Sequence, residues 1–159
     1  MNADDIKRVT VVGTGTMGNG IAQVFAMHGI DVDMVDIKQD FLDRAVAVIT
    51  KSMDRLLKKE KITEDDKTAS LDKLHTGTDL AAAKDSQLVI EAVTENLDIK
   101  LDIFKTLEEH CAPETILASN TSSLPITQLA AATKRPDKVI GMHFMNPVPM
   151  MKLVEVIRG

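Results

Sequence analysis

Short runs of β-branched and other apolar residues recur along the chain and alternate with segments of helical spacing. Six of these runs are expected to be strands: Val9–Val12, Val32–Asp36, Leu88–Ile90, Thr115–Ser119, Val139–Phe144 and Leu153–Ile157. Strands that alternate with helices are typically joined as βαβ units. The pattern therefore predicts an α/β fold built on a mostly parallel sheet.

The segments between these runs place their apolar residues three and four positions apart, as amphipathic helices do. The first expected helix spans residues 17–28 and ends at Gly29, a residue typical of helix C-termini. A longer helix is expected over residues 41–57, and Thr63 is expected to cap a short one because three acidic residues follow it. Another is expected over residues 97–111. The helices after the second strand form an excursion that a minimal βαβ unit does not need.

Length and charge narrow the class of protein. The 159 residues suffice for one domain of ordinary size. A net charge of -5 gives no broad basic surface, so no nucleic-acid partner is expected. No apolar run approaches the ~18 residues of a membrane helix, and Asp4 and Asp5 precede any apolar stretch, so neither an export signal nor a membrane partner is expected. The single cysteine, Cys111, is expected to pack in the core, and its lack of a disulfide partner suits a cytoplasmic location.

The segment Gly13-Thr14-Gly15-Thr16-Met17-Gly18 follows the first expected strand and opens the first expected helix. In such a turn Gly13 permits the tight bend, Gly15 leaves room for a diphosphate, and Gly18 lets the helix pack on the strand. The helix N-terminus then faces the phosphates. The pattern predicts a Rossmann-type, doubly wound dinucleotide-binding domain over residues 1–159. The alternative is an ordinary glycine-rich turn.

An acidic residue, Asp36, ends the second expected strand. A carboxylate there can accept hydrogen bonds from both hydroxyls of an adenosine ribose. Its charge repels a 2′-phosphate, so NAD rather than NADP is the expected cofactor, although the nearby Lys38 offsets part of that repulsion. The alternative role for Asp36 is to cap the following helix.

Polar residues gather at strand ends in the second half, where open α/β sheets place their ligands. Ser119–Ser123 follows one expected strand, although such hydroxyls also serve as turn and helix-cap groups. If residues 146–151 fold the chain back around position 149, His143 and Glu155 lie opposite each other. The carboxylate then fixes the imidazole tautomer and leaves the other ring nitrogen as a base. The alternative is a cross-strand ion pair without a catalytic role.

Together these motifs resemble those of the 3-hydroxyacyl-CoA dehydrogenases, and most closely the bacterial 3-hydroxybutyryl-CoA dehydrogenases. The resemblance covers essentially the whole chain. It rests on Gly13–Gly18, Asp36, Glu91–Glu95, Ala118–Leu124 and Gly141–Val156. It implies reversible hydride transfer between NAD(H) and a 3-hydroxyacyl-CoA or 3-oxoacyl-CoA, in fatty acid or butyrate metabolism.

The same resemblance implies roles for individual residues. It makes His143 the general acid and base, Glu155 its orienting partner, and Ser122 a hydrogen-bond donor to both substrate oxygen and cofactor. Cofactor contacts are implied for two groups: the phosphate turn with Asp36, and the nicotinamide half at Glu95, Lys100, Ser122 and Asn146. Ser52 and Lys59 match positions that contact the nucleotide end of coenzyme A.

The chain departs from the family in two respects. Met145 stands where the family commonly has a second phenylalanine. The family also carries on the order of a hundred further residues, a C-terminal helical dimerisation domain that these 159 residues do not include. A homodimer is expected for full-length members. Two alternative functions remain: a non-catalytic nucleotide-binding module of the same fold, and a related dehydrogenase acting on free 3-hydroxy acids.

Three further groups of residues can have either a purely structural role or a functional one. Met142, Met145, Met150 and Met151 form either core or a wall for an acyl chain. Lys58, Lys59 and Lys61 form either a solvated helix face or a site for coenzyme A phosphates. The histidines, at positions 28, 75, 110 and 143, lack paired metal-ligand spacing, so no metal is expected.

Overall fold

The computed structural model describes residues 2–159 and centres on a seven-stranded sheet in the order β3-β2-β1-β4-β5-β6-β7. The strands are β1 (Arg8–Val12), β2 (Asp31–Val35), β3 (Leu74–Gly77), β4 (Leu88–Glu91), β5 (Ile116–Ser119), β6 (Val139–Phe144) and β7 (Val154–Arg158). The pairs from β3 to β6 are parallel, and β7 runs antiparallel to β6. This order confirms the predicted Rossmann-type, mostly parallel sheet.

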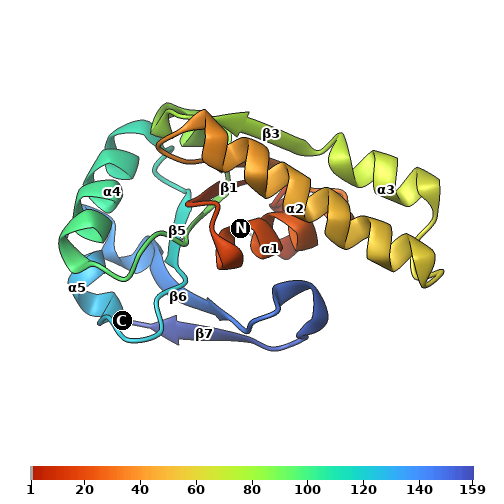
Figure 1. Ribbon diagram of the computed structural model, residues 1–159. Helices are drawn as coiled ribbons and strands as arrows, with labels where there is room; N and C mark the ends of the chain where they lie inside the picture. The colour runs from red at the N-terminus through yellow and green to blue at the C-terminus, as the bar shows by residue number, and fades with distance from the viewer. Residues whose placement is uncertain (1) are drawn as a thin grey trace.

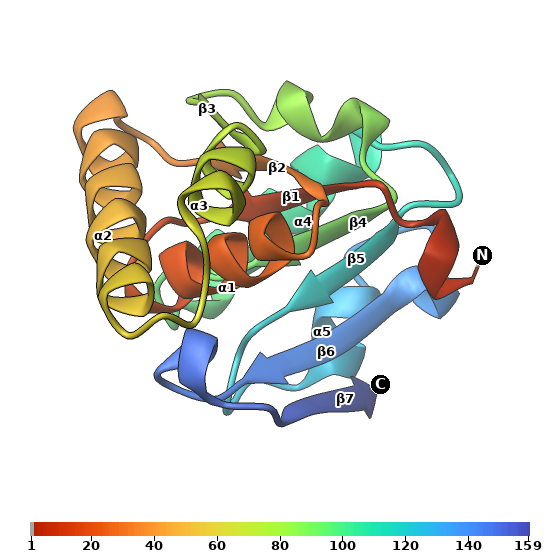
Figure 2. The same ribbon diagram turned by 90° about the vertical axis from the view of Figure 1, so that its right-hand side faces the viewer.

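Helices cover both faces of the sheet (Figures 1 and 2). One face carries α1 (Thr16–Met27), α2 (Gln39–Lys58) and α3 (Glu64–Leu71), and the other carries α4 (Leu97–His110) and α5 (Ile126–Ala130). Short 3-10 turns complete the chain: η1 (Ala3–Asp5), η2 (Leu80–Asp85), η3 (Pro136–Lys138) and η4 (Val148–Met150). Helices α2 and α3 confirm the predicted excursion after the second strand.

The core consists of two clusters, one on each side of the sheet. Successive residues of β4 point to opposite faces and so belong to different clusters. Ile90 belongs to the first cluster, with Ile21 and Ile49. Val89 belongs to the second, with Phe104 and Leu117. Burial on both sides explains why the parallel strands read as nearly continuous apolar runs. As predicted, Cys111 lies in the second cluster.

Local signals place most helix ends correctly. Thr63 caps α3, since its Oγ1 accepts a hydrogen bond from the Asp66 backbone N–H at 3.1 Å. Gly29 follows α1 with a φ of +77°, in the left-handed region that ends many helices. Strand β3 was not predicted because Leu74–Gly77 is a half-exposed edge segment with one large apolar residue. The short helix α5 was likewise missed.

Among residues 2–159, no helix is both long enough and apolar enough to cross a membrane. The carboxyl ends of β1, β4, β5 and β6 lie at the same end of the strands, and Gly13–Gly18, Glu95, Ser122 and Asn146 follow these four strands there. This end is where open parallel sheets bind ligands.

Candidate functional site

The glycine-rich turn has the geometry that its sequence predicts. Gly13 has a φ of +89°, and a Cβ added to it would lie 2.8 Å from the backbone oxygen of Ala92. A Cβ on Gly18 would lie 1.8 Å from the backbone oxygen of Gly13, so α1 packs directly on the turn. Gly15 precedes α1 as its N-cap, and a Cβ there would meet nothing within 4 Å. The unpaired N–H groups at the start of α1 therefore have open space for a diphosphate.

The side chain of Asp36 hydrogen-bonds to this turn and does not cap the following helix. Its Oδ2 accepts hydrogen bonds from the backbone N–H and the hydroxyl of Thr14, each at 2.7 Å. Lys38 is the N-cap of α2, so the alternative in which Asp36 caps that helix is wrong. Lys38 places its ammonium 5.9 Å from the centre of the Phe41 ring.

The turn and Asp36 line a cleft of about 630 Å³. Predicted cofactor residues in its wall are Gly13, Thr14, Gly15, Thr16 and Asp36. Ile37, Phe41 and Val48 add an apolar wall, and Arg44 adds a cation that was not predicted. Backbone donors, the carboxylate of Asp36 and an apolar wall fit the adenosine diphosphate half of NAD.

The predicted pair of His143 and Glu155 forms across the last two strands. The register of β6 and β7 sets the two residues opposite each other, because η4 folds the chain back between them. His143 Nδ1 lies 2.8 Å from Glu155 Oε2. This contact commits one ring nitrogen to the carboxylate and leaves Nε2 for another partner.

His143 opens onto a second cleft of about 350 Å³. The structure brings all four residues expected at the nicotinamide half into its wall, namely Glu95, Lys100, Ser122 and Asn146, and Met17 lines it as well. Met145, one of the four clustered methionines, also lines it, whereas Met142 packs against the core.

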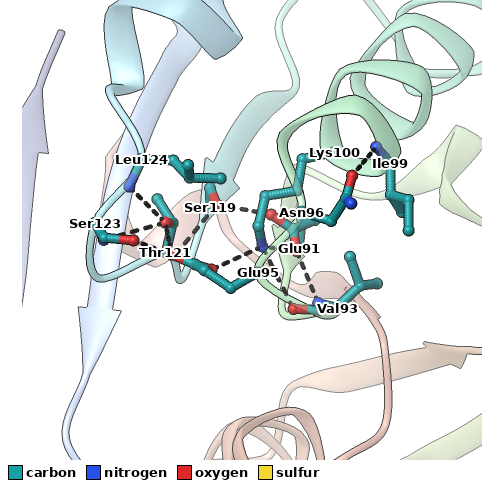
Figure 3. Close-up of polar contacts among 10 residues, drawn as sticks. All are labelled: Glu91, Val93, Glu95, Asn96, Ile99, Lys100, Ser119, Thr121, Ser123 and Leu124. Atoms are coloured by element: carbon teal, nitrogen blue, oxygen red, sulfur yellow. Dashed lines mark hydrogen bonds and ion pairs between the residues drawn. The ribbon is translucent and has the colours of Figure 1, made fainter.

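Behind this cleft lies a buried polar network that sequence reasoning missed (Figure 3). Lys100 and Glu91 are 1% and 0% exposed, and their side chains pair at 2.6 Å. Glu91 also accepts hydrogen bonds from the Ser119 hydroxyl at 2.6 Å and from the Val93 backbone N–H at 2.7 Å. The network joins the ends of β4 and β5 to the first turn of α4. Its one sequence signal is a carboxylate closing an otherwise apolar strand.

Glu95 stands at the open side of the network. Its Oε1 accepts hydrogen bonds from the hydroxyls of Thr121 and Ser123, and its Oε2 lies 3.5 Å from Lys100 Nζ. Burial raises the pKa of Glu95, but these hydroxyl hydrogen bonds and the charge of Lys100 outweigh burial and hold the pKa below its usual value. Ser122 is exposed between the two hydroxyl donors and faces the cleft.

The loop after β5 also uses the turn chemistry that its sequence allows. Thr121 Oγ1 accepts a hydrogen bond from the Leu124 backbone N–H at 3.0 Å. Asn120, whose role was not predicted, accepts one from the Phe144 backbone N–H at 2.9 Å and so ties this loop to the end of β6. Pro125, not a residue of Ser119–Ser123, is the N-cap of α5.

A third groove, of about 380 Å³, runs between α2 and η4. Ser52 and Lys59, the two residues expected at the nucleotide end of coenzyme A, both line it, and Arg55 joins them. Lys58 and Lys61 are exposed and lie outside its wall. Met150 contributes to the groove and is not core.

Comparisons with known proteins agree on one protein family. Residues 8–159 match the model of the "3-hydroxyacyl-CoA dehydrogenase, NAD binding domain" family. Over 149 residues the chain is 56% identical to a "Probable 3-hydroxybutyryl-CoA dehydrogenase" of Deinococcus radiodurans, covering 94% of this chain and 53% of the relative. Over 152 residues it is 50% identical to a 3-hydroxybutyryl-CoA dehydrogenase of Clostridioides difficile, covering 96% and 54% respectively.

A solved structure supports the same assignment. The crystal structure of (S)-3-hydroxybutyryl-CoA dehydrogenase from Ralstonia eutropha superposes with a TM-score of 0.95 at 51% identity, covering 97% of this chain and 54% of that one. The chain thus spans about half the length of the relatives it matches.

Proposed function

The chain belongs to the 3-hydroxyacyl-CoA dehydrogenase family, as an NAD-binding domain, and we propose that it carries the catalytic base for reversible oxidation of an (S)-3-hydroxyacyl-CoA to the 3-oxoacyl-CoA. The observation that carries the proposal is the 2.8 Å contact between His143 Nδ1 and Glu155 beside the second cleft. The names of its relatives favour a short acyl group, as in 3-hydroxybutyryl-CoA and acetoacetyl-CoA. Butyrate or fatty acid metabolism is the corresponding setting.

In this proposal NAD, when bound, supplies the hydride acceptor. His143 takes the proton of the substrate 3-hydroxyl at Nε2 and returns it in the reverse direction. Glu155 holds the imidazole in the tautomer that this transfer needs. Proton transfer by a positioned base contributes about 10²–10⁴-fold to the rate. The exposed hydroxyl of Ser122 donates to the same substrate oxygen as charge develops there.

The three clefts indicate how two large ligands reach one histidine. Ala92 and Val93 line both the first and the second cleft, and Asn146 lines both the second cleft and the third groove. A dinucleotide extending from the glycine-rich turn therefore approaches His143 from one side. An acyl-CoA lying along Ser52 and Lys59 approaches from the other.

An acyl-CoA partner, a cytoplasmic location and a homodimeric whole protein belong to the same proposal. Support for the location is the single thiol of Cys111, which is buried and has no disulfide partner. Burial raises the pKa of this thiol to about 11, so it stays protonated and has no place in the chemistry.

The test is to titrate the chain with NADH by fluorescence and then follow NADH absorbance after adding acetoacetyl-CoA. We expect NADH binding, and oxidation of NADH that falls about 10²–10⁴-fold in His143→Gln. The matched control is His110→Gln, which changes an exposed histidine at the far end of α4. Turnover that survives His143→Gln contradicts the assigned base, and NADH binding without turnover in the wild type favours the non-catalytic module.

A further inference from the structure

Glu91 is a fully buried carboxylate that the proposed chemistry does not use. Both of its oxygens are engaged: Oε1 by Lys100 and the Val93 backbone N–H, and Oε2 by the Ser119 hydroxyl. It is therefore held from β5 and from the loop that leads into α4. A carboxylate fixed in this way serves as a rigid counter-charge.

The ammonium of Lys100 has three protons and three acceptors around it (Figure 3). Glu91 Oε1 lies closest, at 2.6 Å, followed by the Val93 carbonyl oxygen at 3.4 Å and Glu95 Oε2 at 3.5 Å. The first contact is deeply buried, whereas the side chain of Glu95 is 40% exposed. The third contact is thus the longest and the most accessible to a ligand in the second cleft.

Charge explains why the buried contact matters. A buried ammonium is costly unless a counter-charge pairs with it in good geometry. Glu95 gives Lys100 a longer contact, since its Oε1 is engaged by Thr121 and Ser123. Glu91 is the group that fixes where the ammonium lies in the wall of the cleft.

We infer that Glu91 is a positioning residue for the nicotinamide half of the cofactor site. It anchors Lys100 so that one ammonium proton points into the cleft, where the bound dinucleotide replaces Glu95 as acceptor. The inference rests on the proposed function, because it requires the second cleft to hold the nicotinamide half. It concerns Glu91, which acts through Lys100 and touches no ligand itself.

A double-mutant cycle on NADH affinity tests the inference. Glu91→Gln keeps the shape of the side chain, and its amide can still accept from the Val93 N–H and donate to Ser119 Oγ. We expect Glu91→Gln to weaken NADH binding about tenfold, because the buried ammonium of Lys100 loses the counter-charge that fixes its position. Lys100→Met is expected to weaken it at least as much. The double variant is expected to bind no more weakly than Lys100→Met alone, since both changes remove one interaction.

Two controls separate positioning from general damage. ADP occupies only the half of the site at the glycine-rich turn, so its affinity is expected to stay unchanged in Glu91→Gln. Glu108→Gln removes the charge that pairs with Arg135 at 3.1 Å, near the other end of α4, and is expected to leave NADH binding unchanged.

Three results overturn the inference: NADH affinity of Glu91→Gln within about twofold of wild type, additive losses in the double variant, or an equal loss of ADP affinity. If circular dichroism shows Glu91→Gln unfolded, Glu91→Asp replaces it. The aspartate keeps the charge but withdraws it from Lys100, and the same loss is expected. A wild-type chain that binds no NADH refutes the proposed function itself, whereas a wild type that binds and a variant that matches it refute only the role of Glu91.

Discussion

Asp36→Asn isolates the effect of one charge on the choice between NAD and NADP. Asparagine keeps the shape of the side chain, and its amide oxygen can still accept the two hydrogen bonds from Thr14 that hold the turn, while the Ile37 backbone N–H at the edge of the site loses its acceptor, Oδ1. The carboxylate is half-buried at the rim of the first cleft, so water screens it strongly. Two unit charges 4 Å apart in water repel by about 1 kcal/mol, so a 2′-phosphate with about two charges is repelled by about 2 kcal/mol. This energy corresponds to about 30-fold in affinity.

Because Arg44 and Lys38 offset part of this repulsion, we expect the wild-type chain to bind NADH up to about 30-fold more tightly than NADPH, and Asp36→Asn to remove most of that difference. The assay is fluorescence titration with each dinucleotide. Asp40→Asn is the control, since it makes the same charge change in the first turn of α2. The reasoning fails if the NADH to NADPH ratio moves by less than about threefold in Asp36→Asn, or if the wild type prefers NADPH.

Four further changes have defined outcomes. Glu155→Gln should slow acetoacetyl-CoA reduction about a hundredfold while NADH affinity holds, as stopped-flow kinetics and titration will show. Although burial raises it, hydroxyl hydrogen bonds hold the pKa of Glu95 below its usual 4.5. The ionised carboxylate therefore contributes its full stabilisation above pH 4.5, and this contribution is lost as pH falls through the lowered pKa. Urea unfolding at several pH values across that range measures the loss, and Glu95→Gln should make the free energy of unfolding depend less on pH there. With a pKa of about 11, Cys111 should resist iodoacetamide until the chain unfolds. Gly18→Ala should cost about 3 kcal/mol or more in urea unfolding, because its Cβ would lie 1.8 Å from a backbone oxygen of the turn.

Most strands can be predicted from the sequence because the strands at the centre of the sheet are buried on both faces and are therefore continuous apolar runs. The only polar residue in the runs Val9–Val12 and Leu88–Ile90 is Thr10. Both runs can therefore be recognised as strands without knowing which strands pair with them. Strand β3 lies at the edge of the sheet beside β2 and is half-exposed, so its sequence carries little hydrophobic signal. This segment becomes a strand because it pairs with β2, and the local sequence pattern holds no information about that pairing.

The candidate site divides in the same way. The glycine-rich turn is local in sequence, and the pairing of His143 with Glu155 follows from counting across one reversal of the chain. The network of Glu91, Lys100 and Ser119 joins residues 9 and 28 positions apart on different elements. No spacing rule links such positions, because their meeting depends on how α4 packs against the ends of β4 and β5.

A crystal structure of the chain with NADH bound is the most direct test of the arrangement around His143. The diphosphate is expected against the backbone N–H groups at the start of α1, with the adenosine ribose on Asp36 and the nicotinamide ring in the cleft beside His143 and Ser122. A dinucleotide bound in the opposite direction, or with its nicotinamide outside that cleft, contradicts the proposed role of His143.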